Sequence, residues 1–537
     1  MTKLLKNCHS FLLLILVLAV VHSCSTPPPR TQDDYVGPIR KIEDPAPPVS
    51  PSKTTDRPHP VPIEGPLELT IREATILAFE NNREFRVERF VPPIQRTFED
   101  EERAIFDPTL RGSGSWGRER SKSNETTKGY DANLGVSQFL PTGTWLDLAL
   151  QTELERKDPR GFPDDEHETS ADLTVTQALL RGAGLDVNLA TLRQAGIDTS
   201  ASEYELRGLA QSLLAEVENT YWDYVLAKGE VKIFTASLKL ADQLTEETRE
   251  RIQIGQVAES EIFSAEAEAA TREQELINAV SERDRVRLRL LRLTNPSVTN
   301  LWDKELVLTT EPKEPEITLE DMQDHIQIAL RMRPDLNQAR LAVERGELEV
   351  VKTKNGLLPK LDLFIILGRT GYSDSFGGSV RDVWKSDGGL DFFAGLRFEY
   401  PIGNRAPKAR YKRSTLGLER DNDALENLAQ LVEEDVLTAN IEVNRTQKQI
   451  FASAATRKYQ REKLQAEIDK YRLGRSTMFR VAQAQRDLVE SQISEIRARI
   501  GHIKSFTQFY FVEGSLLERR GIEAPGRVTV ELSTAEK

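Results

Sequence analysis

The sequence contains few aromatic residues and almost no cysteine. Its 537 residues are 29% charged but only 7% aromatic, and the mean hydropathy is −0.46. A chain of this length normally forms several domains of about 100 to 200 residues each. Scarce aromatic residues and abundant charges favour long helices over compact cores. Because one of the two cysteines, Cys8, lies in an expected leader, no internal disulfide is predicted for the remaining chain.

The chain also lacks an excess of positive charge. It has 72 Lys and Arg residues against 85 Asp and Glu residues, which gives a net charge of −13. No basic stripe outweighs the acidic residues, so we expect no nucleic-acid partner.

Motifs that carry enzymatic chemistry are missing as well. The six histidines, at positions 9, 22, 59, 167, 325 and 502, show no metal-ligand spacing. The sequence RGAGL (181–185) lacks the third glycine and the strand-to-helix context of a dinucleotide-binding loop. We therefore predict no catalytic residue, no cofactor and no metal site. The two glycines of this segment are interpreted as a flexible entry into a long helix.

The N-terminal segment predicts export and lipid attachment. Residues 1–23 hold an apolar run from Phe11 to Val21 that is typical of a secretory signal and too short to span a membrane. The sequence VHSC (21–24) resembles the bacterial lipoprotein signal, in which the cysteine, here Cys24, becomes an acylated N-terminus. In that type of signal, a residue such as Ser25 in place of aspartate favours the outer membrane. Ordinary cleavage, with Cys24 as a spare thiol, is the alternative.

Residues 24–66 form the next expected segment, a lipid-anchored tether. Twelve of the 42 residues from Ser25 to Pro66 are proline. So much proline excludes regular helix and sheet and predicts an extended, semi-rigid spacer.

The chain then repeats itself. The segment that begins at Leu69 aligns with the segment that begins at Ile317, and RIQIGQVAESEIFSAEAE (251–268) aligns without a gap with the stretch around Gly474. We interpret this as an internal tandem duplication. The first repeat spans residues 67–310, the second spans residues 311–522, and a C-terminal tail occupies residues 523–537.

Each repeat contains segments of strict alternation. Leu146, Leu148 and Leu150 point to one side of an extended chain, and Asp147 and Gln151 point to the other. The pattern predicts strands with one apolar and one polar face, although a strand of a soluble sandwich has the same pattern. Four strands are predicted in the first repeat, at about 108–117, 131–139, 144–154 and 171–178, and two are predicted in the second.

Long helices follow the strands. Residues 199–254 lack proline, and residues 408–473 form a counterpart that would span about 100 Å at about 1.5 Å per residue. Helices of this length pack as coiled coils. Gly255 and Gly474 are typical of a helix C-terminus, and Ser476 and Thr477 could cap the next helix. Each repeat therefore predicts a helical hairpin with an exposed tip.

In these residues the chain resembles the TolC-type outer membrane efflux protein family, in a lipoprotein variant. The resemblance covers residues 67–522. It is carried in order by FDPTL (106–110), QALLRGAGLDVNLA (177–190), RPDLNQARLAVE (333–344), GLLPKLDL (356–363), FEYPIGNRAPKARY (398–411), the two tips and EGSLLERRGI (513–522).

The resemblance implies an α+β membrane protein, a homotrimer whose strands form one outer-membrane β-barrel continued by an antiparallel α-helical periplasmic tunnel. Its implied function is the outer-membrane channel of a tripartite efflux or type I secretion system. Its implied partners are outer-membrane lipid, a periplasmic adaptor protein and an inner-membrane transporter. A coiled-coil lipoprotein tether or adhesin without a pore is the alternative, but a tether does not explain the strands.

The resemblance also implies the functional residues. The residues expected to dock the adaptor are those of the tips: Ile254, Gly255, Val257, Ala258, Leu473, Gly474, Ser476 and Thr477. The residues expected to form the periplasmic gate are Glu261, Tyr471, Arg480 and Gln483.

The chain departs from the family pattern in three respects. Arg480 and Gln483 occupy positions where well-known members carry aspartates, so no acidic ring is expected there. Ser476 replaces an arginine of the polar lock, which predicts weaker closure. The four strands of the first repeat would give a trimer eighteen strands instead of twelve, unless the additional hairpin lies outside the barrel.

Overall fold

The computed structural model describes residues 66–120, 126–157, 164–296, 300–312, 321–385 and 390–526. The expected signal segment (1–23), Cys24, almost all of the expected tether and residues 527–537 of the expected tail lie outside the described residues. The chain divides into two compact units, and each contains parts of both repeats. Among the described helices, none is long and apolar enough to cross a membrane.

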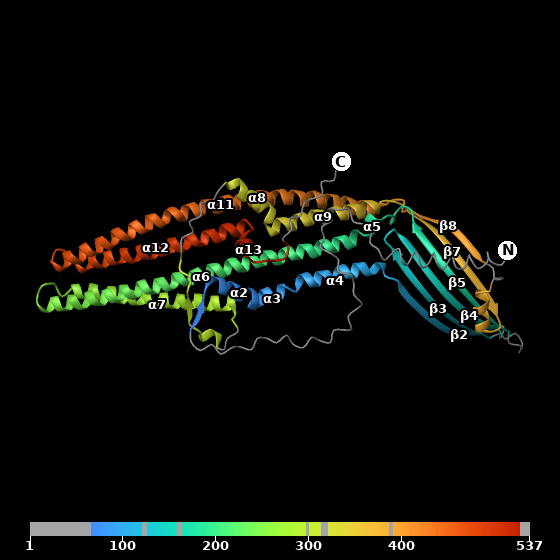
Figure 1. Cartoon of the computed structure of the whole chain (residues 1–537), viewed down its shortest axis with the longest axis horizontal. Coiled ribbons are helices and arrows are strands. Elements are labelled where there is room, and N and C mark those ends of the chain that lie inside the picture. Colours follow the sequence, from blue (N-terminus) through green and yellow to red (C-terminus); the bar gives the residue numbers. More distant parts are fainter. Residues whose placement is uncertain are drawn as a thin grey trace. The chain divides into compact units, whose positions relative to one another are not determined.

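One unit is a single antiparallel sheet, formed by residues 104–189 and 358–403 (Figure 1). The six strands lie in chain order, so each pairs with its neighbours in the sequence. All four strands of the first repeat therefore belong to the same sheet as the two strands of the second. The strands are β2 (Thr109–Arg120), β3 (Thr126–Leu140), β4 (Thr144–Lys157), β5 (Asp164–Ala178), β7 (Lys360–Ser373) and β8 (Asp391–Glu399).

The two faces of this sheet differ in polarity. On one face Leu148 of β4 lies opposite Leu173 of β5 and Val136 of β3, and this face continues to Leu367 of β7 and Phe392 of β8. The other face is largely polar, and there Arg111 pairs with Asp147 while Gln151 donates to Asp131. Leu148 is 50% exposed and Phe392 is 65% exposed in the single chain. An apolar face of this extent normally has a partner surface or lipid against it.

A short helix that the sequence did not predict lies on the apolar face. Helix α10 (Phe376–Val383) lies between β7 and β8 in the chain, and its Ser379 hydroxyl is 2.8 Å from the hydroxyl of Thr169 on β5. A Cβ atom at Gly371 of β7 would lie 2.5 Å from the Ser379 carbonyl oxygen. Glycine at 371 is therefore what allows the helix to approach the strand so closely.

The second unit is helical and comprises residues 66–103, 190–357 and 404–526 of the described chain. Helix α4 packs on α6, α6 packs on α9, and α9 packs on α11, so these four form a row. Helices α6 and α7 form one hairpin, and α11 and α12 form the other (Figure 1). The helices are α2 (Ile71–Asn81), α3 (Arg83–Glu88), α4 (Val91–Arg103), α6 (Ala190–Gln253), α7 (Glu261–Thr294), α8 (Met322–Met332), α9 (Pro334–Asn355), α11 (Arg405–Arg472), α12 (Met478–Val512) and α13 (Leu516–Arg519), with a short turn at η2 (Leu301–Asp303). The short turns η1 (Ala104–Phe106) and α5 (Leu185–Asn188) belong to the sheet unit.

The main core of the helical unit surrounds a small parallel strand pair. Strand β1 (Leu67–Leu69) pairs with β6 (Leu306–Leu308), which joins the two ends of the first repeat. Tyr221 of α6 donates to the Leu69 carbonyl at 3.1 Å, and Tyr224 donates to the Leu306 carbonyl at 3.3 Å. Both tyrosines are almost completely buried, so these hydrogen bonds satisfy hydroxyls that would otherwise be unpaired in the core.

Candidate functional site at the hairpin tips

Both hairpins turn at a glycine, as the sequence predicted. Gly255 has a φ of 74° and Gly474 has a φ of 70°, the left-handed conformation that glycine adopts without strain. At the first tip, the Gln256 amide donates to the Arg251 carbonyl at 2.9 Å. At the second tip, the Arg475 amide donates to the Lys470 carbonyl at 2.8 Å. This is the hydrogen bond that closes a helix end after a left-handed residue.

The tips expose most of the residues that were expected to dock a partner. Ile254 is 67% exposed and Leu473 is 71% exposed, so each tip presents a large apolar side chain to solvent. Val257 is half-buried and packs against the apolar cluster beneath the tips. Of the remaining expected docking residues, Gly255, Ala258, Gly474 and Thr477 are exposed and Ser476 is half-buried.

An apolar cluster joins the two hairpins just behind the tips. It draws residues from both hairpins, and Tyr471 and Met478 at its centre are 1% and 0% exposed. The two tips are therefore packed together by buried side chains. The buried members are Leu244, Ala265, Leu464, Ile468, Tyr471, Met478, Val481 and Ala484.

Arg251 of the first hairpin binds the C-terminus of α11 in the second. It donates to the Tyr471 carbonyl at 2.9 Å and to the Arg472 carbonyl at 2.6 Å. Its guanidinium carbon also lies 5.0 Å from the centroid of the Tyr471 ring. The Tyr471 carbonyl also accepts from the Gly474 amide at 3.0 Å. A cation at this position adds a donor at the C-terminal end of α11 and complements the helix dipole. Arg251 was not among the predicted site residues, because its partners are distant in the sequence.

Glu261 of the first hairpin binds the N-terminus of α12 in the second. Its carboxylate accepts a hydrogen bond from the Met478 amide, at the start of α12, at 2.7 Å. Thr477 does occupy the N-cap position of α12, but its hydroxyl makes no capping hydrogen bond. The Ser476 hydroxyl donates instead to Glu467 at 2.8 Å. Hydrogen bonds from Lys470 and Ser476 lower the pKa of Glu467 below its usual value of 4.5.

The four expected gate residues divide into two groups. Glu261 and Tyr471 lie at the contact between the hairpins, and the Tyr471 hydroxyl is 2.9 Å from that of Thr248. Arg480 and Gln483 lie on the exposed side of α12, where Gln483 donates to Asp487 at 2.8 Å. Three residues apart on one helix, Arg480 and Gln483 share a face. In the single chain, then, the first pair ties the hairpins and the second pair faces solvent.

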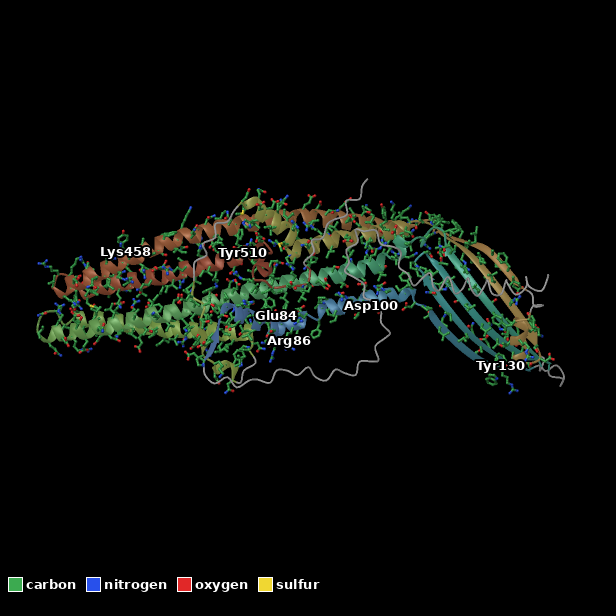
Figure 2. The ribbon with its side chains drawn as sticks, in the orientation of Figure 1. Glu84, Arg86, Asp100, Tyr130, Lys458 and Tyr510 are labelled. Atoms are coloured by element: carbon green, nitrogen blue, oxygen red, sulfur yellow. The ribbon has the colours of Figure 1, made fainter. Side chains whose placement is uncertain are left out.

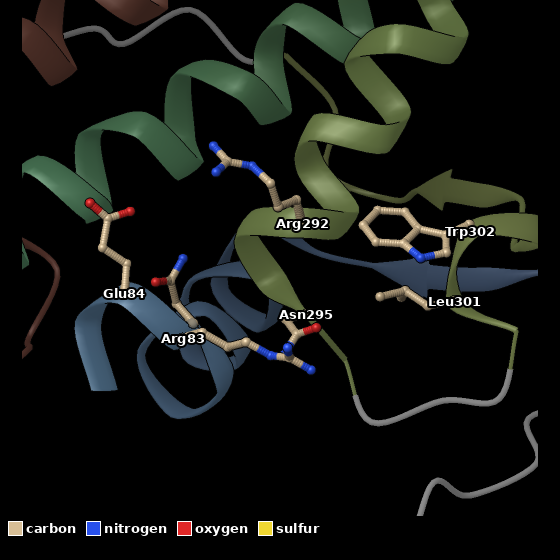
Figure 3. Close-up of a pocket in the computed structure, with 7 residues that line it drawn as sticks. Arg83, Glu84, Arg292, Asn295, Leu301 and Trp302 are labelled. Carbon is tan, nitrogen blue, oxygen red and sulfur yellow. The ribbon is translucent and has the colours of Figure 1, made fainter. Parts of the chain in front are cut away.

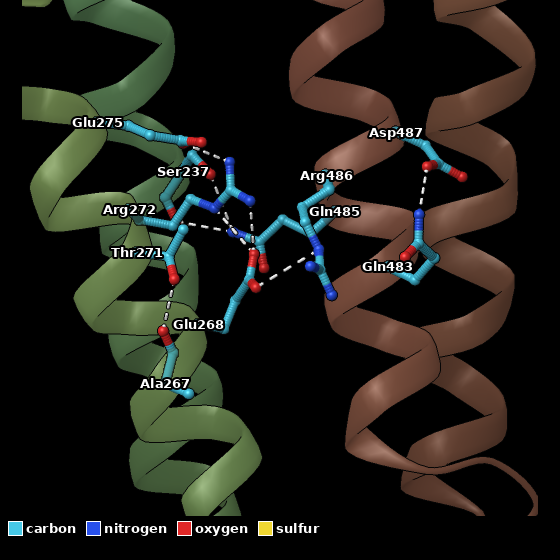
Figure 4. A network of polar contacts seen from close by, with 10 residues as sticks. All are labelled: Ser237, Ala267, Glu268, Thr271, Arg272, Glu275, Gln483, Gln485, Arg486 and Asp487. Carbon is cyan, nitrogen blue, oxygen red and sulfur yellow. Dashed lines mark hydrogen bonds and ion pairs between the residues drawn. The ribbon is translucent and has the colours of Figure 1, made fainter. Parts of the chain in front are cut away.

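Farther from the tips, a buried polar network crosses from one hairpin to the other (Figure 4). Arg272 is 2% exposed and binds Glu268 at 2.8 Å and Glu275 at 2.5 Å within α7. Arg486 of α12 lies 3.7 Å from Glu268, and Gln485 donates to the Ser237 carbonyl at 2.8 Å. Buried charges need such partners, because an unpaired one is costly in the interior.

A pocket of about 510 Å³ lies elsewhere in the helical unit (Figure 3). Asn82 and Asn295 line it, but both amides are engaged by backbone carbonyls, of Leu293 and Asn81 respectively. Its remaining lining residues are Arg83, Glu84, Arg292, Leu301 and Trp302. In the part of the chain that the structure describes, no cluster of His, Cys, Asp or Glu could hold a metal ion. The tips are therefore the stronger candidate site.

Comparison with known proteins finds similarity in part of the sequence and in the fold. Residues 325–508 match the family model for outer membrane efflux protein, whereas a sequence comparison with curated proteins finds no match. The solved outer-membrane channel OprN is similar with 16% identity and a TM-score of 0.62, over 83% of this chain and 90% of that one.

Two further solved channels give the same result. The CmeC outer membrane channel of Campylobacter jejuni has 14% identity and a TM-score of 0.62, over 83% of this chain and 86% of that one. The MtrE outer membrane channel of Neisseria gonorrhoeae, solved in its open state, has 18% identity and a TM-score of 0.61, over 83% and 89%. Residues 325–508 therefore match the family model for outer membrane efflux protein, and the chain has the fold of the solved outer-membrane channels.

Proposed function

We propose that this protein is the outer-membrane channel of a tripartite efflux or type I secretion system. The observation that supports this most strongly is the combination of two features in one chain. A six-stranded sheet has one apolar and one polar face, and two hairpins of very long helices end in exposed tips. Alternating apolar and polar residues suit a barrel wall between lipid and water, and long helices suit a conduit across the periplasm.

The sheet, the acylated N-terminus and the hairpin tips each have a role in this channel. Three copies combine their sheets into a barrel in the outer membrane, and acyl chains on Cys24 add a second attachment to lipid. The apolar side chains of Ile254 and Leu473 at the tips contact a periplasmic adaptor, which connects the channel to an inner-membrane transporter. Arg480 and Gln483 line the periplasmic entrance, and the contacts of Glu261 and Tyr471 hold it closed.

The alternative function, a lipoprotein tether or adhesin without a pore, is disfavoured by the sheet. A tether needs the acyl chains and the helices but has no use for an apolar face such as that of Leu148 and Leu173. The two functions predict different behaviour when lipid attachment is removed.

The deciding experiment is extraction of membranes that contain the Cys24→Ala variant with a secretion signal of the ordinary type. A channel remains in the membrane pellet after high salt and sodium carbonate and is released only by detergent. A tether that depends on its acyl chains has no attachment left in this variant and is released by salt or carbonate, and this result would overturn the proposal. Wild-type protein, which keeps Cys24, is the matched control.

A further inference from the structure

Helix α10 is packed tightly against the apolar face of the sheet. Its Ser379 and Val383 side chains point to the strands and are 0% and 2% exposed. A Cβ atom at Gly371 of β7 would lie 2.6 Å from the Val383 amide nitrogen, so helix and strand are in direct backbone contact. The helix is therefore a fixed part of the apolar face.

The sides of α10 that do not contact the sheet differ in character. Phe376, Val380 and Trp384 follow one another at intervals of four residues and share one side of the helix. Phe376 is 52% exposed and Trp384, which ends the helix, is 74% exposed. Arg381 and Lys385 lie on the next side and are exposed as well. An apolar side next to a basic side is typical of helices that lie between the acyl chains and the headgroups of a membrane.

The strands under α10 carry aromatic residues at the same level. The register aligns Trp116 of β2, Tyr130 of β3 and His167 of β5 in one row across the apolar face. Tyr130 lies toward the end of the sheet at which β2 and β3 are joined (Figure 2). Ser379 of α10 contacts Thr169, two positions from this row. Tryptophan and tyrosine are enriched where a barrel wall crosses from lipid to water.

Two arginines beside this apolar surface lack an acidic partner. Arg369 is half-buried and lies two positions before Gly371 on β7, so both belong to the face that α10 covers. Among the described residues, neither Arg369 nor Arg381 forms an ion pair, whereas Lys385 binds Asp382 at 3.4 Å. A charge on a lipid-facing surface is tolerated near the membrane interface but not at the bilayer centre. A guanidinium there can bind a phosphate group through two hydrogen bonds.

The chain order shows which end of the sheet carries α10. Strand β2 follows α4 and β8 is followed by α11, so the helices join the sheet at the start of β2 and at the end of β8. Helix α10 follows the end of β7, at the opposite end of these strands. In a channel whose long helices lie in the periplasm, α10 therefore belongs to the outer leaflet.

From these observations we propose that α10 binds an anionic, phosphorylated lipid of the outer leaflet. Phe376, Val380 and Trp384 lie among the acyl chains. Arg369 and Arg381 bind the phosphate of the headgroup. The inference rests on the proposed channel function, which places the apolar face of the sheet against lipid.

Fluorescence quenching by brominated lipid tests whether Trp384 lies in the membrane. The protein is reconstituted into vesicles of phosphatidylglycerol with brominated acyl chains, which quench the tryptophans that contact them. Because the chain has five tryptophans, the signal of one is the difference between wild type and the variant that lacks it. Trp384→Phe reports on α10 and Trp116→Phe reports on the sheet. Trp302→Phe is the control, since Trp302 is 54% exposed but lies in the helical unit.

The inference and the proposed function predict separate parts of this result. We expect quenching of Trp384 and Trp116 but not of Trp302. If Trp116 is quenched and Trp384 is not, the sheet lies in lipid without α10, which overturns the inference and leaves the channel intact. If neither is quenched, the sheet does not lie in the membrane, and the proposed function is overturned as well.

A comparison of two lipids tests the role of the arginines. Brominated phosphatidylglycerol and brominated phosphatidylcholine are each diluted to the same mole fraction in unbrominated phosphatidylcholine. Basic residues at a membrane surface attract anionic lipid, so the relative affinity at Trp384 should favour phosphatidylglycerol several-fold. The double variant Arg369→Gln and Arg381→Gln should lose this preference.

Arg397→Gln is the matched control for the double variant. Arg397 lies on β8 opposite Asp362, on the polar face of the sheet, so its loss should leave the lipid preference unchanged. Equal quenching of wild type by the two lipids would overturn the inference. A preference that survives in the double variant would contradict the assignment of the phosphate to Arg369 and Arg381.

Discussion

The carboxylate of Glu261 accepts a hydrogen bond from the backbone amide of Met478 at 2.7 Å, across the two hairpin tips. Arg251 donates to the carbonyls of Tyr471 and Arg472 at the other side of the same turn. The first hairpin thus satisfies both helix ends of the second, the last carbonyls of α11 and the first amide of α12. Movement of one tip away from the other must break both contacts.

Loss of the Glu261 carboxylate should loosen the second tip. Glu261→Ala leaves the Met478 amide without its acceptor, and loss of a capping side chain costs about 0.5 to 2 kcal/mol. We expect faster hydrogen exchange at residues 471–480, with a smaller effect for Glu261→Gln, which keeps an acceptor. Glu259→Ala, two residues away and exposed, is the control. Equal exchange in Glu261→Ala and the control would show that this contact does not hold the tip.

Arg251 should stabilise the second tip more than its neighbour Arg249 does. Arg251 donates to helix-end carbonyls, whereas Arg249 forms exposed ion pairs with Glu246 and Glu266. Hydrogen bonds from a charged donor are worth about 1.5 to 3 kcal/mol, and exposed ion pairs are worth about 0 to 1 kcal/mol. Arg251→Met should therefore increase protease cleavage within 471–477 more than Arg249→Met does. Similar cleavage of the two variants would contradict the assigned role of Arg251.

The hydrogen bonds of Glu467 predict that the thermal stability contributed by the second tip depends on pH. Hydrogen bonds from Lys470 and Ser476 hold the pKa of Glu467 below its usual value of 4.5, so the folded tip favours the carboxylate. The stabilisation is complete above pH 4.5 and is lost as the pH falls through the lowered pKa. The thermal midpoint of wild type should exceed that of Glu467→Gln at pH 6, and the difference should shrink as the pH falls below 4.5 through the lowered pKa. A difference that is constant with pH would exclude this carboxylate as its source.

The apolar face of the sheet should tolerate no charge. Leu148→Arg places a cation on the face expected to contact lipid, which costs about 2 to 4 kcal/mol near the centre of a bilayer. Ala149→Arg is the matched control, because Ala149 is adjacent in β4 but points to the polar face beside Asp172. We expect the first variant to yield much less folded, heat-modifiable protein in the outer membrane than the second. Equal yields would show that this face does not contact lipid.

Much of the fold could be predicted from local patterns. The strand predicted at 144–154 is β4 (144–157), and the helix predicted at 408–473 is α11 (405–472). The strands extend farther than predicted at their polar ends, where backbone pairing continues after the alternation of apolar residues has stopped. Strands β1 and β6 were missed because each has only three residues and depends on a partner more than 230 positions away.

The candidate site was predicted less completely. The turns at Gly255 and Gly474 could be found because a left-handed helix end has a strong sequence signal. The interpretation of Thr477 as a capping hydroxyl was wrong, because this hydroxyl makes no capping hydrogen bond. Glu261, from the other repeat, instead accepts from Met478, the first amide of α12. Arg251 carries no local signal that separates it from Arg249. Contacts between hairpins are tertiary, and periodicity cannot reveal them.

The most direct test of the account is the conductance of the purified, detergent-extracted protein in planar bilayers, with Arg480→Asp beside wild type. A channel with its constriction at the hairpin end predicts stepwise currents, and reversing the charge of exposed Arg480 should raise the preference for cations. Arg285→Asp, farther along α7 and 74% exposed, should leave the preference unchanged. Folded trimers that pass no current in any of these variants, even after Arg251→Met loosens the tips, would contradict the central claim.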